Sequence, residues 1–343
     1  DTSYMKDGQL FNEYRLRDSI DKRNSENAIG VRNLWTIAEG LRFSTGFEYL
    51  RVLEGDGFPA TAASLGLDYT ANPLWKGSAR LEARRDKNPA DPTTTWLSTL
   101  GLARKLNRDW TFLGKNIYSL TDRTLTADQV NERLQMGFAY RDTDTNRINW
   151  LSRYQYSYFK NDPALGVSAD PTLSSIQQPL KAVHELSTHV DYHPARPHFV
   201  NGGYAARWVK DTFANADGSR KESTYLEHWL RGRYVYDVTE RWDIGLLGSL
   251  KYNANADGLQ TKTRDYAAGI EMGYLMHQNL WASLGYNFIG FSDSLTGLAD
   301  DNYTSKGPFL RLRYKFDHHT FSGKDSAVNK TLIPDATKLD EKK

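Results

Sequence analysis

The residues best suited to chemistry gather between positions 184 and 198. His184, His189, Asp191, His193 and His198 could serve as metal ligands, and HPARPH places the last two histidines five residues apart. A metal ion needs three or four converging ligands with hydrogen bonds to support them. Alternation along a strand puts His189 and Asp191 on one face and His184 on the other. Two ligands at best converge, so we predict solvated histidines and no metal site.

The same stretch also contains the residue types of a hydrolase. Ser187 lies two residues before His189 and shares its face with His189 and Asp191. Nucleophilic catalysis also needs donors for an oxyanion and a groove for the substrate, and nothing nearby marks either. GLGLDY and GGYAARW are small residues within strands rather than phosphate-binding loops. We predict no enzyme, with no catalytic residue and no cofactor.

These side chains belong to a sequence in which apolar and polar residues alternate strictly. The alternation determines to which face of a strand each side chain points. In PFLRLRYKF (308–316), leucines and aromatic residues alternate with Arg311, Arg313 and Lys315. A soluble sandwich can close over only a small charged surface, whereas this pattern recurs along nearly the whole chain. We predict an all-β, transmembrane antiparallel up-and-down β-barrel in a bacterial outer membrane, with lipid outside and water or ion-paired side chains inside.

The composition agrees with this prediction. No run of about 18 apolar residues exists, which excludes a transmembrane helix. Hydrophobic residues make up only 39% of the chain, but half of each barrel strand faces the lumen, so barrels look polar on average. Cysteine is absent, which removes disulfides and thiolate chemistry. The 44 basic and 42 acidic residues are interleaved, so no basic patch indicates nucleic acid as a partner.

Runs of about ten residues with period two predict about sixteen strands. They cover residues 9–17, 27–36, 40–51, 60–71, 74–85, 94–105, 108–119, 130–141, 147–159, 180–192, 197–209, 223–237, 240–252, 262–275, 279–290 and 304–316. The links alternate between short ones, such as ANPL (71–74) and VTER (238–241), and longer polar ones. Short periplasmic turns and long extracellular loops are typical of outer-membrane barrels.

Strand parity predicts which charged residues line the lumen. A midplane Arg or Lys facing lipid costs about 2 to 4 kcal/mol, so the charged positions must point inward. The lumen-lining candidates are Arg15, Arg42, Arg80, Glu82, Lys115, Arg153, Arg207, Arg231, Arg233, Glu271, Arg311, Arg313 and Lys315. They could line a path for solutes or could pair with one another around a plug.

Tryptophans beside the short links predict an aromatic girdle at the lipid headgroups. The candidates are Trp35, Trp75, Trp110, Trp150, Trp242 and Trp281. The alternation ends after Phe316, so we predict a barrel over residues 1–317 and a flexible polar tail over 318–343. The start, DTSYMKDGQL, resembles no signal peptide, so one has been removed or the chain is part of a longer protein.

Three blocks resemble a known family. DVTERWDIGLLGSLKYN (237–253), AAGIEMGYLMHQNLWASLGYNFIGFSDSLTG (267–297) and YTSKGPFLRLRYKFD (303–317) are similar to the C-terminal outer-membrane β-barrel domain of large modular, repeat-containing proteobacterial surface proteins. Earlier segments, from about residue 60 onward, resemble the same family. The resemblance implies a barrel that ends a long modular polypeptide, and it supplies no catalytic residue.

Two functions remain open. The barrel could be a porin-like pore for small polar solutes or a threaded segment, or a non-conducting anchor of a larger surface protein or assembly whose outer loops bind partners. Porins commonly fold a long loop inward, and residues 161–179 are the candidate. The predicted partners are outer-membrane lipid, the barrel-assembly machinery, and upstream modules or a periplasmic partner.

Overall fold

The computed structural model describes residues 2–18, 23–55, 58–124, 128–161, 180–214, 220–255, 262–277, 280–293 and 303–314. These residues form seventeen β-strands. None of them belongs to a helix that is long and apolar enough to cross a membrane. The predicted tail, Lys315 and most of the candidate inward loop at 161–179 lie outside the described residues.

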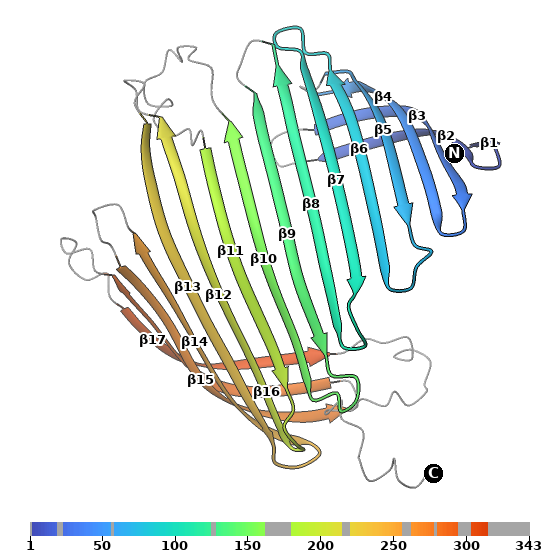
Figure 1. Ribbon diagram of the computed structural model, residues 1–343. Coiled ribbons are helices and arrows are strands. Elements are labelled where there is room, and N and C mark those ends of the chain that lie inside the picture. The colour runs from blue at the N-terminus through green and yellow to red at the C-terminus, as the bar shows by residue number, and fades with distance from the viewer. Residues whose placement is uncertain are drawn as a thin grey trace, which may run out of the picture.

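The strands follow one another along the whole described chain (Figure 1). Strands β1 to β6 span Thr2–Met5, Gly8–Asp18, Arg23–Ala38, Leu41–Glu54, Ala60–Tyr69 and Trp75–Asp86. Strands β7 to β12 span Thr93–Lys105, Trp110–Arg123, Gln129–Arg141, Ile148–Asn161, Leu180–Tyr192 and His198–Ala214. Strands β13 to β17 span Arg220–Asp237, Trp242–Asn255, Lys262–His277, Leu280–Asp293 and Tyr303–Tyr314.

Each strand pairs antiparallel with the next strand along the chain, from β1–β2 to β16–β17. The predicted all-β, up-and-down antiparallel fold is therefore confirmed. The sixteen predicted runs correspond one to one with β2–β17, although several strands, above all β3, β8 and β12, extend beyond them. The prediction missed β1, because four residues are too few to show a period.

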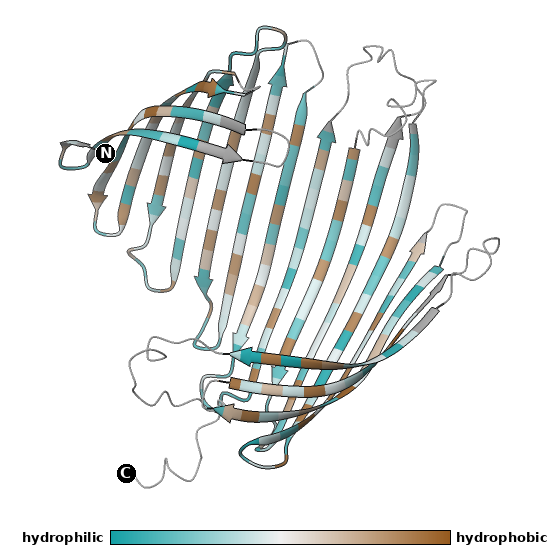
Figure 2. Cartoon of the chain, turned by 180° about the vertical axis from the view of Figure 1, so that it is seen from behind, coloured by the Kyte–Doolittle hydropathy of each residue, from teal (hydrophilic) through white to brown (hydrophobic). Residues whose placement is uncertain are grey.

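The two faces of the sheet differ in chemistry. Direct register partners share a face in an antiparallel sheet, so one assignment propagates through every strand. Leu310 and Leu312 on β17 are 69% and 65% exposed, and Arg311 and Arg313 point the opposite way. We call the side of the two leucines the outer face and the side of the two arginines the inner face. Figure 2 shows the resulting alternation of hydropathy along the strands.

Glycine allows close packing on the inner face near the start of the sheet. Phe11 on β2 lies directly opposite Gly30 on β3, and a Cβ at Gly30 would come within 2.6 Å of the Phe11 ring. The guanidinium of Arg32 lies 4.1 Å from the centroid of the same ring. The ring is therefore held between a bare backbone and a cation.

The sheet curls, and its first and last strands lie at opposite edges (Figures 1 and 2). Within the described ranges, β17 makes no contact with β1 or β2. The short β1 pairs only with Gly8 to Leu10, so the edge of β2 is open from Phe11 onward. An open edge in hydrocarbon leaves N–H and C=O groups unsatisfied. Strand direction alternates, so β17 would meet β2 antiparallel.

We expect β17 to pair with β2 in a bilayer, because this closes the sheet and satisfies both edges. Cysteines placed at Tyr14 and, in turn, at Pro308, Leu310 or Leu312 should form a disulfide in at least one pair. Their Cα atoms would then approach within about 4.4 to 6.8 Å. The natural chain has no cysteine, so no background disulfide competes.

The matched control combines Tyr14→Cys with Leu100→Cys on β7, which lies on the outer face of a strand five positions away. Absence of a cross-link in every β17 pair, in protein that has inserted into lipid, would contradict the closure.

Hydrogen bonds to one aspartate organise the turn between β9 and β10. The Thr145 hydroxyl donates to the Asp142 carboxylate, and the backbone N–H groups of Thr145, Asp144 and Arg147 donate to it over 3.0, 3.2 and 3.3 Å. These donors, led by the Thr145 hydroxyl, lower the pKa of Asp142 to about 2. Asn146 completes the turn with a φ of 52°, a conformation that asparagine tolerates well.

The low pKa of Asp142 predicts how this turn responds to acid. The pKa is depressed in the folded state, so its contribution is fully present above the unfolded value near 3.9 and is lost as the pH falls through about 2. Asp142→Asn should therefore lower the amide-exchange protection of residues 144–147 at pH 6. The natural chain should lose this protection between pH 4 and pH 2, and the variant should lose less of it. Asp144→Asn is the control, because the Asp144 carboxylate pairs with Arg108. Equal effects of the two substitutions would refute the assignment.

Candidate functional site

The inner face carries charged side chains on strands from β2 to β17. Twelve of the thirteen predicted lumen-lining residues are described, and strand register places all twelve on this face. The thirteenth, Lys315, lies outside the described residues. Parity also places Arg32 and Arg133 there, two residues that the prediction left out.

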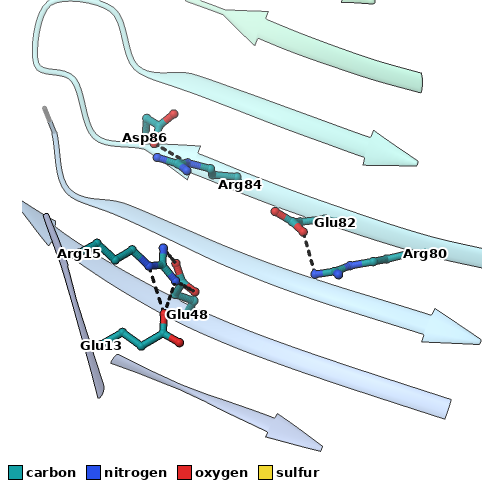
Figure 3. A network of polar contacts seen from close by, with 7 residues as sticks. All are labelled: Glu13, Arg15, Glu48, Arg80, Glu82, Arg84 and Asp86. Carbon is teal, nitrogen blue, oxygen red and sulfur yellow. Dashed lines mark hydrogen bonds and ion pairs between the residues drawn. The ribbon is translucent and has the colours of Figure 1, made fainter. Parts of the chain in front are cut away.

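Ion pairs on β2, β4 and β6 form the first part of this face (Figure 3). The Arg15 guanidinium lies 2.9 Å from the Glu13 carboxylate and 3.1 Å from the Glu48 carboxylate, so one cation bridges two strands. On β6, Arg80 pairs with Glu82 over 3.2 Å. Arg42 lies opposite Asp68 in the register of β4 and β5. Each charge here has a neighbour of opposite sign.

A concave region of about 820 Å³ lies over these strands. Its polar lining includes Arg32, Glu48, Ser64, Arg80 and Glu82. The hollow therefore opens on the charged side of the sheet, which is the side expected to face a lumen. A space of this size, lined by donors and acceptors, suits water and small polar solutes.

Ion pairs continue through the middle of the wall. Arg153 on β10 lies 3.0 Å from Glu185 on β11. Glu227 on β13 lies 3.6 Å from both Arg207 on β12 and Lys251 on β14. A single carboxylate thus links three consecutive strands.

Glu271 on β15 makes the longest connection. Its side chain is fully buried, and its two oxygens accept hydrogen bonds from Arg233 on β13 and, over 3.1 Å, from Arg311 on β17. The carboxylate passes over Gly245 on β14, where an added Cβ would come within 2.7 Å of the Glu271 Cγ. Glycine at position 245 is therefore what allows Glu271 to reach two strands away. We call Glu271, Arg233 and Arg311 the Glu271 clamp.

Some inner cations have no carboxylate partner in the described part of the chain. Lys115 and Arg133 are exposed and make no ion pair there. Arg231 lies over the Trp229 ring at 5.1 Å and places its Nη2 3.4 Å from His189 Nδ1. The charges of Lys115 and Arg133 are therefore not compensated by any carboxylate in the described ranges.

The histidines around residues 184–198 do not converge. His184 is on the outer face, with its Nδ1 2.8 Å from the Tyr154 hydroxyl. His189 is on the inner face, 3.4 Å from the Asp191 carboxylate, and the Asn201 amide contacts both residues. Ser187 makes no hydrogen bond to His189 among the described residues. No group of three or more potential metal ligands occurs in the described ranges.

The tryptophan candidates divide into two groups. Five belong to the outer face. Trp35 stacks on Phe43, Trp75 on Tyr69, and Trp242 packs against Tyr274, while Trp110 and Trp150 contact each other edge to face. Trp281 differs from the prediction. Its side chain is buried on the inner face, with the Arg313 guanidinium 4.9 Å from its ring. The prediction used distance from the turn and ignored parity, which places Trp281 in phase with Ser283 and Gly285.

Comparisons with known proteins place the chain beside solved outer-membrane proteins at low identity. No family model and no curated protein matches the sequence. The alcaligin outer-membrane receptor FauA of Bordetella pertussis is 13% identical, with a TM-score of 0.47, over 93% of this chain and 60% of that one. The ferric citrate transporter FecA is 12% identical, with a TM-score of 0.45, over 84% of this chain and 53% of that one. The chain therefore spans about half the length of FecA.

A third neighbour is closer in length. OccK8 (OprE) of Pseudomonas aeruginosa is 10% identical, with a TM-score of 0.36, over 91% of this chain and 99% of that one. All three are similar to this chain in strand architecture alone, and scores below 0.5 carry no argument about what it transports or binds.

The Glu271 clamp predicts a measurable loss of stability on substitution. Glu271→Gln keeps the size of the side chain but removes the charge that both arginines face. Removing one member of a buried pair costs several kcal/mol, and the arginines are 29% and 48% exposed, so solvent screens part of this. We expect the free energy of unfolding from lipid vesicles in urea to fall by about 1 to 3 kcal/mol.

Glu82→Gln is the matched control for this measurement. Glu82 pairs with Arg80, which is 62% exposed, so its loss should cost less than about 1 kcal/mol. If Glu271→Gln destabilises the barrel no more than Glu82→Gln does, the clamp has no structural role.

Proposed function

We propose that the chain forms an integral β-barrel of a bacterial outer membrane, with a porin-like lumen for small polar solutes. The observation that carries this proposal is the concentration of charged side chains on the inner face, opposite an outer face with exposed leucines such as Leu310 and Leu312. An apolar surface of this kind is stable against lipid, and the charged surface is stable against water. The wall side chains of a barrel of about 16 strands cannot fill its interior, which leaves room for a lumen.

The inner cations that make no ion pair among the described residues suggest which charge of solute the lumen favours. Lys115 lies on β8 and Arg133 on β9, and both face the same side as the ion pairs of β10 to β13. A cation without a partner raises the local concentration of anions. We therefore expect the lumen to favour small anionic solutes over cations of similar size.

The second candidate function is a non-conducting anchor for a larger surface protein or assembly. The resemblance of residues 237–317 to the barrel domains of modular surface proteins motivates it. The ion pairs around Glu227 and Glu271 also favour it, because they hold side chains in place across several strands. In that case a segment of the same polypeptide, such as residues 318–343, would occupy the lumen.

Conductance in a planar lipid bilayer separates the two functions. An open pore should give stable single-channel conductance that rises in proportion to salt. In a KCl gradient, the double variant Lys115→Glu/Arg133→Glu should shift the reversal potential towards the equilibrium potential of K⁺. The reason is that it replaces two positive groups with negative ones. The double variant Arg80→Gln/Glu82→Gln is the control, because it removes both members of an ion pair and leaves the net charge of the inner face unchanged.

Deletion of residues 318–343 completes this test. Conductance that appears only in the shortened chain would identify the tail as a plug and favour the anchor. Silence of both the intact and the shortened barrel, with insertion into lipid verified, would refute the porin-like function.

A further inference from the structure

Three basic side chains gather on the outer face around β5. Arg51 on β4 is exposed and lies two residues beyond Tyr49 on the same face. Tyr49 is opposite Thr61 of β5, and Thr61 is opposite Arg85 of β6, which is also exposed. Tyr49 and Arg85 therefore flank Thr61, whose side chain is small, and Arg51 lies two residues further along the same face.

Lys87 completes the group. Its backbone N–H donates to the Pro59 carbonyl over 2.9 Å, which ties the segment after β6 to the link before β5. Its Nζ lies 5.8 Å from the centroid of the Tyr49 ring. Arg51, Arg85 and Lys87 thus surround Tyr49 and Thr61, and we call these three residues the basic triad.

The charge of the basic triad is not compensated within the described ranges. None of its three members makes an ion pair there. The nearest acidic residue in sequence, Asp86, belongs to the inner face and pairs with Arg84 over 2.9 Å. The contrast with the inner face is clear, because there Arg15, Arg80 and Arg84 each have a carboxylate partner.

The level of the basic triad matches one edge of a membrane. Arg85 lies ten residues after Trp75, whose ring stacks on Tyr69 on the outer face at the other end of the strand. Ten residues at about 3.3 Å each, tilted by about 40°, span a height of about 25 Å. This is about the height of the apolar band of an outer-membrane barrel. Trp75 and Arg85 therefore stand at opposite headgroup levels.

The surface between these levels is apolar. Leu65 on β5 and Leu81 on β6 are direct partners and are 51% and 46% exposed. Phe47 on β4 is 52% exposed on the same face. A lipid acyl chain could lie along these side chains while its headgroup reached the basic triad.

We propose that the basic triad and the apolar surface below it bind a phosphorylated membrane lipid. A phosphate monoester carries about −1.5 to −2 charges near neutral pH and offers three strong acceptor oxygens. Two guanidinium groups and one ammonium group supply matching charge and donors. A zwitterionic headgroup would leave the net charge of the triad uncompensated. The ligand class is therefore a lipid with an exposed phosphate, in the leaflet at the longer-loop end of the barrel.

The test measures binding of a bis-phosphorylated glycolipid to the full chain in neutral detergent micelles. Its dephosphorylated form and inorganic phosphate are the comparison probes. Each surface cation contributes about a fivefold factor to the attraction of an anionic lipid surface. The triple variant Arg51→Gln/Arg85→Gln/Lys87→Gln should therefore weaken binding of the phosphorylated lipid by about a hundred-fold.

Arg104→Gln is the matched control for the triple variant. Arg104 is an exposed cation on the outer face, but it lies beside Trp75 at the opposite end of the wall. It should leave the affinity within about twofold of the natural chain, because it is far from the proposed headgroup position. Circular dichroism and heat-dependent migration in electrophoresis are the checks that each variant retains the barrel.

Four outcomes would overturn the proposal. The triple variant could bind the phosphorylated lipid as tightly as the natural chain does, or Arg104→Gln could cause an equal loss. The dephosphorylated lipid could bind as well as the phosphorylated form, which would assign the affinity to acyl chains alone. Inorganic phosphate could bind as tightly as the lipid, which would make the triad a site for free anions.

Discussion

The constraint on which the whole structure depends is the pairing of backbone N–H and C=O groups away from water. In hydrocarbon, each unpaired group costs several kcal/mol, so a strand is stable only with a neighbour on each side. Consecutive hairpins meet this need at the lowest loop-closure cost, and every recorded pairing joins strands adjacent in the chain. The same constraint makes the edges of β2 and β17 the costliest parts of the sheet. The closure that we expect between them would thus be a requirement of the solvent and not of any particular side chain.

Once the strands are paired, alternation separates lipid from water. The outer face needs no specific contacts, and its exposed leucines and aromatic residues suit lipid. The inner face places many charged groups close together, and these groups form ion pairs with groups of opposite charge on other strands. Arg15 joins β2 to β4, Glu227 joins β12 to β14, and Glu271 joins β13 to β17. The Arg15–Glu48 pair and both Glu271 pairs link strands that are not hydrogen-bonded neighbours, so they resist distortion of the curled wall.

Much of this architecture follows from period two alone. The runs predicted from alternation correspond to β2–β17, and parity puts Arg15, Glu271 and Arg311 on one face without knowledge of the fold. The partners of Glu271 could not be predicted, because its reach across two strands depends on Gly245 and on side-chain directions that alternation does not encode. Trp281 was assigned to the wrong face because turn proximity was used where parity was decisive. Strand β1 has only four residues, which is too few to show a period of two.

The inner and outer charges follow different rules because they face different media. An inner arginine can remain unpaired at small cost, since water in a lumen solvates it, yet seven described inner arginines have a carboxylate partner, namely Arg15, Arg80, Arg84, Arg153, Arg207, Arg233 and Arg311. An outer arginine costs about 2 to 4 kcal/mol at the midplane and about 0 to 1 near the headgroups. Arg51 and Arg85 are therefore tolerable only at the level where they lie. Three like charges at that level still repel one another, and an anionic headgroup relieves this repulsion without any rearrangement of the wall.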